Sequence, residues 1–427
     1  MKFNIITFGC KVNSYESEYI KEQLLNNGYV YSDNVKDSDI IIVNTCSVTN
    51  VADTKCFKTI RGIKRDNSNA ILMVCGCSSQ NNQDEYKDMD IDILLGTNDK
   101  KNALSLIEDY RRNKIKFVKF ADSKRRDFED MKVDNFNDLT RAYVKIQDGC
   151  NNYCTYCVIP YVRGSIRSKD FDETVNEIRE LVDHGHKEIV FTGIDTGAYG
   201  KETNGKYDLV KLIREISKFD NLHRIRVSSI EITTLTDEFI DELKNNKKVC
   251  GHLHISLQSG SEHILELMNR KYNKQEYLDK VKSLRDARPD INLTTDVIVG
   301  FPTETEEEFN ECVEFCREVK FSKIHVFPYS IRKGTKAAEM DGQIDGAIKK
   351  ERARRLIEID NDLQLEFNKQ FIGKTVNVLV EETKAGKSIG HTENFLKVYI
   401  NDVVESNTFV DVEIISADIE SVTGNVK

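Results

Sequence analysis

The sequence predicts an α/β protein with three parts: an N-terminal parallel α/β sandwich, a central partial barrel of six βα units, and a small C-terminal β-barrel. Continuous apolar strands alternate with helical patterns through residues 1–118 and again through 140–345, as in parallel sheets covered by helices. From 369 onward, short strands with apolar residues at every second position are separated by turn residues. A chain of 427 residues is also too long for one ordinary core, so several domains are expected.

The first part contains three strand–helix units whose strands each lead to a cysteine. We expect strands at 3–7, 40–44 and 70–74, and helices at 14–26, 50–65 and 99–113. Cys10, Cys46 and Cys77 follow these strands in turn. Parallel sheets bind ligands beyond the carboxyl ends of their strands, so the three thiols are expected to converge at one edge. The pattern predicts a site with three thiolate ligands and a fourth position free.

The third position of this site has two candidate thiols. A single cysteine is more often a small buried hydrophobe than a ligand, but three at successive strand ends are hard to explain by packing. Cys75 competes with Cys77, because a period of two puts both on the same side of a strand. We choose Cys77, which lies past the strand end and after a glycine that lets the backbone turn. The remaining cysteines outside the triads are interpreted as ordinary core or surface thiols: Cys56, Cys250, Cys312 and Cys316.

A second group of three cysteines opens the central part. Cys150, Cys154 and Cys157 have C-x₃-C-x₂-C spacing and follow a short apolar strand. Four thiolates close a 4Fe–4S cube, whereas three leave one iron open to bind something else. A zinc knuckle or chance spacing is the alternative, but zinc structural sites need a fourth ligand nearby and the next histidine is His184. The spacing therefore favours an iron–sulfur cluster.

Six strand patterns of the central part lie at 142–146, 188–192, 224–229, 252–257, 293–299 and 323–327. Helical patterns at 172–184, 209–218, 237–245 and 305–319 separate them. Parallel barrels carry their chemistry at the carboxyl ends of the strands, and polar residues follow several of these strands. They are Gly193, Asp195, Glu231, Gln258, Ser259 and Asp296. A buried polar group needs a partner, so each of these residues contacts either other protein groups or a ligand.

Three further segments complete the chain. Residues 119–139 are polar and charged and indicate a linker, with basic residues at 111–126 that are either a solvated face or an RNA-phosphate contact. Arg163 and Arg167 follow the cysteine loop and can pair with a carboxylate or a phosphate, so they are candidate substrate or RNA contacts. A long polar helix at 348–367 indicates a bridge over 346–368 to the C-terminal barrel of 369–427.

Composition limits the compartment and the partners. The net charge of −9 predicts no strong nonspecific binding of nucleic acid, so any RNA contact must come from local patches. There is neither a long apolar run nor a signal-peptide pattern, and we expect a cytoplasmic protein without a membrane span. Eleven cysteines in such a chain favour metal binding or reduced thiols over disulfides.

The second triad and the strand before it resemble the signature of the radical S-adenosylmethionine (SAM) enzymes. The resemblance implies that the open iron binds the amino and carboxylate groups of SAM, which is then cleaved to a 5′-deoxyadenosyl radical. It also implies that the loop at 192–200 contacts the methionine amino group of the cofactor. Around one barrel mouth, the polar residues named above resemble the cofactor and substrate pocket of that superfamily.

The N-terminal motifs narrow the resemblance to the methylthiotransferases. These motifs are Phe8-Gly-Cys10-Lys-Val-Asn13, Asn44-Thr-Cys46-Ser-Val48 and Gly76-Cys77. In that family the three cysteines hold an auxiliary 4Fe–4S cluster. The C-terminal part resembles the TRAM domain, an OB-like RNA-binding barrel, with Phe395, Lys397 and Tyr399 as candidate RNA contacts, although a barrel that only packs on the enzyme is the alternative.

The subfamily is suggested by three motifs: the first cysteine motif, Thr196-Gly-Ala-Tyr-Gly200, and Asn269-Arg-Lys-Tyr272. They resemble the methylthiotransferases that act on N6-threonylcarbamoyladenosine beside the tRNA anticodon, and Arg270 and Tyr272 are candidate substrate contacts. Two SAM molecules are implied: one methylates a sulfur on the auxiliary cluster, and the other yields the radical that removes hydrogen from carbon 2. A flavodoxin-like or ferredoxin-like electron donor is implied, and the sulfur source stays open.

Three alternatives remain at this point. The first is the same chemistry on isopentenyladenosine, whose enzymes usually read Gly-Cys-Gln-Met-Asn at the first motif. The second is the same chemistry on an aspartate of a ribosomal protein. The third is a non-enzymatic iron–sulfur or zinc protein that binds RNA.

Overall fold

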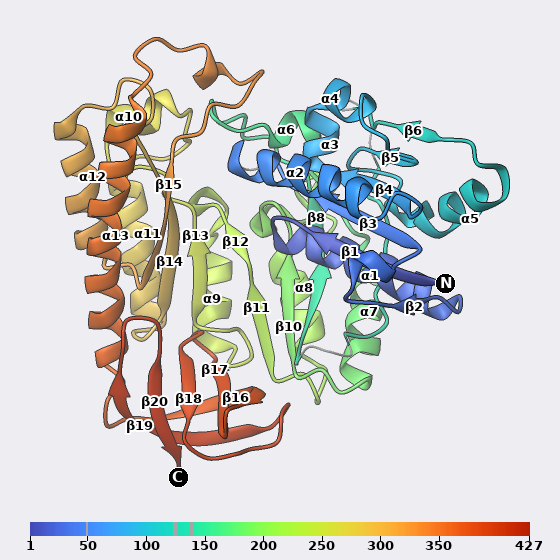
Figure 1. Ribbon diagram of the computed structural model, residues 1–427. Coiled ribbons are helices and arrows are strands. Elements are labelled where there is room, and N and C mark those ends of the chain that lie inside the picture. The colour runs from blue at the N-terminus through green and yellow to red at the C-terminus, as the bar shows by residue number, and fades with distance from the viewer. Residues whose placement is uncertain (48–49, 123–126, 137–139) are drawn as a thin grey trace.

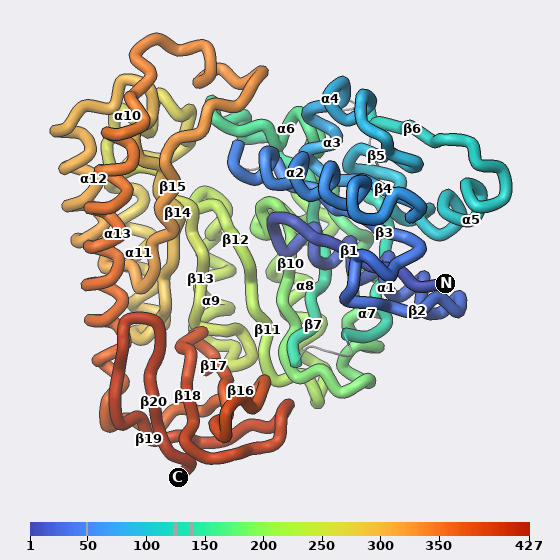
Figure 2. Tube along the Cα trace, viewed as in Figure 1, coloured from blue at the N-terminus to red at the C-terminus, as the bar shows by residue number. Residues whose placement is uncertain are grey.

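The computed structural model describes residues 1–47, 50–122, 127–136 and 140–427, and contains an N-terminal α/β part, a central α/β part and a C-terminal barrel (Figure 1). The N-terminal part lies beside the first strands of the central part, and the C-terminal barrel lies below the central part in this view (Figure 2). The predicted fold class is confirmed in all three parts. No helix in the described parts of the chain is long and apolar enough to cross a bilayer.

The N-terminal sheet has six parallel strands in the order β2-β1-β3-β4-β5-β6. In that order the strands are Val30–Tyr31, Lys2–Thr7, Ile40–Thr45, Ile71–Gly76, Ile93–Leu95 and Phe117–Lys119. Helices α1 (Lys11–Asn26) and α5 (Ala103–Asn113) bury apolar residues on one face, and α2 (Asn50–Asp66) and α4 (Gln83–Lys87) on the other. The short helix α3 (Cys77–Asn81) follows β4. Sequence patterning missed β2, β5 and β6, because two or three residues are too few to show a period.

The central part is an open, barrel-like wall of parallel strands in two sheets, β11-β10-β7 and β12-β13-β14-β15. The third predicted strand is broken at Ser228 into β11 and β12, so the six predicted βα units are present. The strands are β7 Arg141–Lys145, β10 Glu188–Thr192, β11 Arg224–Val227, β12 Ser229–Ile230, β13 His252–Ile255, β14 Asn292–Val299 and β15 Lys323–Pro328. The helices are α7 Phe171–Asp183, α8 Leu209–Ile216, α9 Asp237–Asn245, α10 Glu262–Leu267, α11 Lys274–Ala287 and α12 Glu306–Val319.

The C-terminal part is a closed barrel of five strands in the order β16-β17-β18-β20-β19. Its strands are β16 Thr375–Lys384, β17 Lys387–Thr392, β18 Lys397–Ile400, β19 Phe409–Ala417 and β20 Val422–Val426. Alternate residues such as Val378, Val380 and Val398 point inward and form its core, as a period of two requires. The long helix α13 (Gly346–Lys369) packs against β15 and leads into this barrel.

The segment between the first two parts is packed rather than solvated where the structure describes it. Residues 120–122 and 127–136 form no helix or strand, yet Met131, Val133 and Phe136 are buried in the core of the central part. The apolar residues of this segment therefore hold it against the barrel. Three of the basic residues noted above, at 124–126, lie outside the described residues.

Candidate functional site

The second cysteine triad lies on a loop that returns tightly on itself. The loop runs from the two-residue strand β8 (Gln147–Asp148) to helix α6 (Ile159–Val162), and β8 pairs antiparallel with β9 (Arg167–Ser168). Gly149 has a φ of +74°, and a Cβ there would lie 2.0 Å from the carbonyl oxygen of Ser165, so only glycine fits. Backbone bonds from Cys150 to Gly164 and from Cys157 to Cys154 fix the loop.

The three thiols of this loop are free, and burial raises the pKa of Cys150 and of Cys157 to about 12. Such thiols stay protonated at neutral pH unless a metal displaces the proton. The donor set fits a cluster with three thiolate ligands and one open iron.

The first cysteine triad converges at the carboxyl edge of the N-terminal sheet, as predicted. Cys10 follows β1, Cys46 follows β3, and Cys77 begins α3 directly after β4. A Cβ on Gly9 would lie 2.5 Å from the sulfur of Cys46, so the end of β1 approaches that thiol closely. In the described parts of the chain, none of the three takes part in a disulfide.

The structure separates Cys75 from Cys77. Gly76 has a φ of +114° and turns the chain between them. Cys75 is buried in the apolar cluster under α1 and α5, where burial raises its pKa to about 12. Cys77 instead packs against Val158 and Val162, next to the second cysteine loop. This placement favours Cys77 as the ligand.

Arg163 lies in the interior between the N-terminal part and the central part, and of its two expected partners, a carboxylate or a phosphate, the structure supplies carboxylates. Its guanidinium is fully buried and bonds to four groups: Glu16 Oε1 and Asp148 Oδ2, each at 3.1 Å, Asn13 Oδ1 at 2.8 Å, and Cys77 Sγ at 3.2 Å. Arg167 is buried beside it and also pairs with Asp148, at 3.0 Å. Both arginines satisfy internal carboxylates, because an unpaired buried carboxylate would be costly.

The predicted cofactor residues at the barrel mouth form a connected group. Gln147 Oε1 accepts hydrogen bonds from the backbone amides of Ile194 and Asp195, which fixes the glycine-containing loop after β10. Asp195 accepts a bond from the amide of Glu231. Burial, and then the charge of Glu231, raise the pKa of Asp195 to about 6. A buried carboxylate of this kind is suited to hold a cationic amino group.

Arg270 and Tyr272 belong to this same group and not to an outer RNA-binding surface. Arg270 pairs with Glu231 and donates a hydrogen bond to Cys154 Sγ at 3.3 Å. The hydroxyl of Tyr272 donates to the carbonyl of Leu257. Each cysteine triad therefore has one arginine bonded to one of its sulfurs.

Two adjoining cavities lie between the triads and share Asp296 and Phe327. The smaller, of about 210 Å³, is lined by Cys157, by Gln258, whose φ is +72°, and by Ser47, the neighbour of Cys46. The larger, of about 710 Å³, is lined by Cys10, by Gly193 and by residues of all three parts of the chain. Ser259 is fully buried and accepts a bond from the amide of Ser261, so it supports the turn after β13.

Family comparisons agree with this architecture. Residues 144–316 match the model of the radical SAM superfamily, and residues 2–96 match the model described as uncharacterized protein family UPF0004. The chain is 42% identical over 400 residues to the threonylcarbamoyladenosine tRNA methylthiotransferase MtaB of Bacillus subtilis, covering 92% of this chain and 88% of that protein. It is 40% identical to the protein of the same name from Thermotoga maritima, with coverages of 92% and 90%.

The chain belongs to the radical SAM methylthiotransferase family. It is also 36% identical to the tRNA-2-methylthio-N(6)-dimethylallyladenosine synthase of Alkaliphilus oremlandii, over the whole of this chain and 92% of that protein. Among solved structures, the radical SAM methyltransferase TsrM of Kitasatospora setae shares the fold, with a TM-score of 0.55, 16% identity, and coverage of 79% of this chain and 75% of that one. As a radical SAM protein, the chain uses SAM and a 4Fe–4S cluster.

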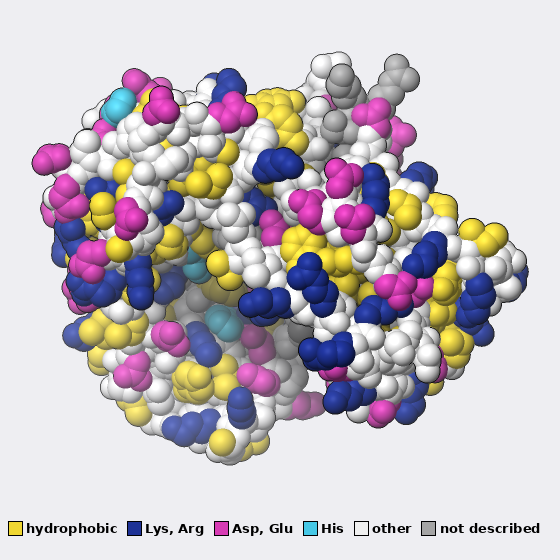
Figure 3. All heavy atoms as spheres, turned by 45° about the horizontal axis from the view of Figure 1, so that its top comes forward, with side chains coloured by type: hydrophobic (Ala, Val, Ile, Leu, Met, Phe, Trp, Pro, Cys, Tyr) yellow, Lys and Arg dark blue, Asp and Glu magenta, His cyan; other side chains and the backbone are white. Residues whose placement is uncertain are grey.

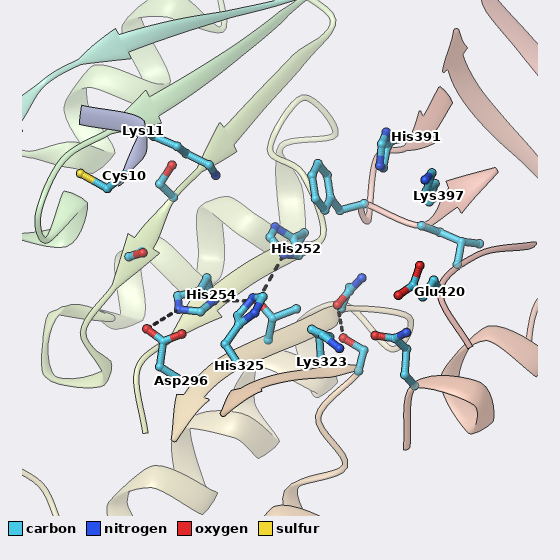
Figure 4. A pocket seen from close by; sticks show the side chains of 18 of the residues that line it. Cys10, Lys11, His252, His254, Asp296, Lys323, His325, His391, Lys397 and Glu420 are labelled. Carbon is cyan, nitrogen blue, oxygen red and sulfur yellow. Dashed lines mark hydrogen bonds and ion pairs between the residues drawn. The ribbon is translucent and has the colours of Figure 1, made fainter. Parts of the chain in front are cut away.

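The larger cavity of this methylthiotransferase carries residues that sequence reasoning did not select. Four of the eight histidines line it: His252, His254, His325 and His391 (Figure 4). His254 Nε2 lies 3.3 Å from Asp296 Oδ2, and its Nδ1 lies 3.0 Å from Thr294 Oγ1. The sequence did contain a pattern that could have found two of them: His252 and His254 are two residues apart on one predicted strand and so point to the same face.

The candidate RNA residues of the C-terminal barrel are largely engaged within the chain. Phe395 stacks on His391 with ring centroids 4.6 Å apart, and the guanidinium of Arg226 lies 4.7 Å from its ring centroid. Lys397 lies over the ring of Tyr399 at 5.0 Å. Phe395 and Lys397 line the larger cavity, so in this methylthiotransferase they form one wall of it.

Proposed function

We propose that this chain transfers a methylthio group to carbon 2 of N6-threonylcarbamoyladenosine at position 37 of tRNA, beside the anticodon. The observation that carries the proposal is the pair of adjoining cavities, one lined by Cys10 and the other by Cys157, which share Asp296 and Phe327. A reaction that activates a carbon at one centre and delivers sulfur from another needs both centres to reach one bound base. An adenosine of the anticodon loop suits such a pocket, because an unstacked base can enter it more easily than a base in a duplex.

The division of the chain follows from this proposal. Residues 1–118 carry a second 4Fe–4S cluster on Cys10, Cys46 and Cys77, and residues 140–345 hold the radical cluster on Cys150, Cys154 and Cys157. The segment 119–139 links them, 346–368 forms the bridging helix, and 369–427 forms the TRAM-like barrel. When bound, the two clusters and SAM supply the one-electron chemistry at carbon 2 and the sulfur.

The residues of the chain have binding and shielding roles in this proposal. Asp195, Glu231 and Gln258 hold the cofactor at the barrel mouth, Gly193 lets it approach the backbone, and Ser259 supports the turn beside it. Asp296 lines both cavities, so it faces the bound base as well as the cofactor side. The C-terminal barrel closes the far side of the larger cavity with Phe395 and Lys397, which keeps water away from reactive species. Tyr399 lies beside Lys397 at the edge of that wall. The partners are the tRNA anticodon loop and a flavodoxin-like or ferredoxin-like electron donor.

The choice of the threonylcarbamoyl substrate has two supports. The relatives named for it are 40–42% identical to this chain, and the relatives named for the dimethylallyl substrate are 35–38% identical. Charged and polar side chains stand among the apolar ones that line the larger cavity, including Lys11, His254, Asp296 and His325. These polar groups suit a substituent with a carboxylate and a hydroxyl better than an apolar dimethylallyl group, which could not pair with them. The dimethylallyl substrate is the second candidate, because one relative named for it matches this chain over its full length.

Mass spectrometry of tRNA nucleosides tests the proposal. Cells that lack the gene should accumulate N6-threonylcarbamoyladenosine and lose its 2-methylthio derivative, and expression of this chain should restore it. Reconstituted protein with SAM and a reductant should modify anticodon stem-loop RNA that carries the threonylcarbamoyl group. Modification of the dimethylallyl RNA alone would assign the second candidate, and modification of neither RNA would reject both.

A further inference from the structure

Lys11 brings a positive charge into the larger cavity from the N-terminal part. It follows Cys10 directly and begins α1, and Figure 4 shows its side chain reaching toward His252. In the described residues it makes no hydrogen bond or ion pair. The other lysines of the lining differ: Lys323 pairs with Asp360, and Lys397 lies over Tyr399. Lys11 is therefore the lining lysine whose ammonium is available to a ligand.

The charges around Lys11 favour an anionic ligand. Arg226 and Arg141 act electrostatically on its ammonium, and the ammonium acts in turn on His252. The carboxylate of Glu188 is shared among the arginines of this region, at 2.7 Å from Arg226 and 2.9 Å from Arg141. Arg141 also pairs with Glu381. The two arginines and Lys11 outnumber the carboxylates of Glu188 and Glu381, which leaves the Lys11 end of the cavity with an excess of positive charge.

Asp296, His254 and His325 form the opposite wall of the cavity. Their ligating atoms all lie within 4.8 Å of one another, and the two imidazole rings are 5.7 Å apart. His325 is exposed to the cavity, and Figure 3 shows histidine side chains inside a hollow of the surface. A carboxylate beside two imidazoles can accept from hydroxyl and amide hydrogens and can donate to an oxygen.

We propose that the ammonium of Lys11 binds the carboxylate of the threonylcarbamoyl substituent, while Asp296, His254 and His325 bind its hydroxyl and amide groups. The inference rests on the proposed function and names the groups that select the substrate. The substituent has one carboxylate, one hydroxyl and amide hydrogens. Among the described lining residues, Lys11 offers a cation without an ion pair, opposite a wall of mixed donors and acceptors. A dimethylallyl group would enclose the ammonium of Lys11 without a partner, which is why such a site rejects an analogue that lacks the polar groups.

A double-mutant cycle between the protein and the substrate tests the contact at Lys11. The wild-type protein, Lys11→Gln and Lys11→Arg are compared on two anticodon stem-loop RNAs. One RNA carries the threonylcarbamoyl group and the other its carboxamide, which has the same shape and no charge. The dissociation constant of each RNA and the KM of methylthiolation are measured for each protein. Iron content checks that the neighbouring cluster at Cys10 is intact, and cleavage of SAM without RNA checks the radical cluster at Cys150, Cys154 and Cys157.

The wild type should bind the carboxylate RNA about 10- to 100-fold more tightly than the carboxamide RNA, as expected for one charge-assisted contact. Lys11→Gln should lose this preference, and Lys11→Arg should keep most of it. Equal weakening of both RNAs by Lys11→Gln would overturn the inference, because Lys11 would then act elsewhere. Wild-type protein that modifies only dimethylallyl RNA would instead reject the proposed function.

His325→Phe tests the opposite wall, because phenylalanine keeps the ring and removes both nitrogens. The variant should raise the dissociation constant of the threonylcarbamoyl RNA more than that of an RNA with an unsubstituted target adenosine. An equal effect on both RNAs would overturn this part of the inference. Stoichiometric zinc in the wild type that disappears in His325→Phe would also overturn it, since the three side chains would then hold a cation.

Discussion

The guanidinium of Arg163 lies 3.2 Å from the sulfur of Cys77, although the two residues belong to different parts of the chain. Arg163 follows the second cysteine loop, and Cys77 is in the first triad. The same guanidinium pairs with Glu16 on α1 and with Asp148 before the loop, all in the interior. The contact fixes the position of one triad relative to the other and supplies an N–H donor to a candidate cluster ligand.

Arg163→Met should destabilise the protein and alter the cluster that Cys10, Cys46 and Cys77 would hold. Loss of the guanidinium leaves buried carboxylates without a partner, and breaking a buried pair costs about 3–5 kcal/mol. An N–H donor to a ligand sulfur stabilises the reduced cluster, so its loss should lower the reduction potential of that cluster.

Melting temperature and an EPR-monitored redox titration measure the two effects. Arg354→Met, at an exposed ion pair on α13, is the control and should change neither. An unchanged potential in Arg163→Met would show that the bond to Cys77 has no electronic role.

Cys77→Ala and Cys75→Ala distinguish the ligand from the core thiol. Anaerobically reconstituted wild type should bind about eight irons, as two 4Fe–4S clusters. Cys77→Ala should lose the cluster of the first triad (Cys10, Cys46 and Cys77). Cys75→Ala should keep that cluster, because Cys75 is in the apolar core under α1 and α5. Iron analysis and EPR spectra measure the result. The reverse pattern would mean that the ligand is the thiol before Gly76.

Separate roles for the two triads predict separable activities. A variant with Cys10→Ala, Cys46→Ala and Cys77→Ala should retain one cluster and still cleave SAM to 5′-deoxyadenosine when given a strong reductant. It should make no methylthiolated tRNA, because nothing remains to present the sulfur. The variant with Cys150→Ala, Cys154→Ala and Cys157→Ala should also lose the cleavage. If the variant without Cys10, Cys46 and Cys77 still delivered methylthio groups to tRNA, the cluster on those three cysteines would be structural only.

Glu188 should make the attachment of the C-terminal barrel sensitive to acid. The carboxylate of Glu188 forms ion pairs with Arg226 and Arg224. Arg226 donates a hydrogen bond to the carbonyl of Glu393, and Arg224 to the carbonyl of His391, both in the C-terminal barrel. Burial opposes its ionisation, but Arg226 and Arg141 overcome this and lower its pKa to about 2. Glu188→Gln should therefore cost about 3–5 kcal/mol at neutral pH.

The effect of Glu188 should depend on pH in one direction. Because its pKa is depressed in the folded state, its stabilisation is complete above the unfolded value of about 4.5 and is lost as the pH falls toward 2. The difference in melting temperature between wild type and Glu188→Gln should be largest at pH 7 and smaller at pH 4. Glu215→Gln, at a surface ion pair, is the control and should show little effect at either pH. A difference that grows on acidification would contradict the assignment.

The sequence by itself determined the three-part fold and the two cysteine triads. These features depend on local periodicity and on spacing along the chain: strands of a parallel sheet place their carboxyl ends at one edge, so Cys10, Cys46 and Cys77 had to converge. The turn at Gly76 also separated Cys77 from Cys75 in the way that a glycine at a strand end predicts.

Only the tertiary structure decided which polar residues face a ligand. The sequence left open whether Arg163 and Arg167 pair with a carboxylate of the chain or with a phosphate of RNA, and in the folded chain both are buried against Asp148. Lys11, His325 and Phe395 come from three parts of the chain and meet in one cavity, and no local pattern records that meeting. A period shows which residues share a face of one element, whereas the packing of whole elements determines what that face meets.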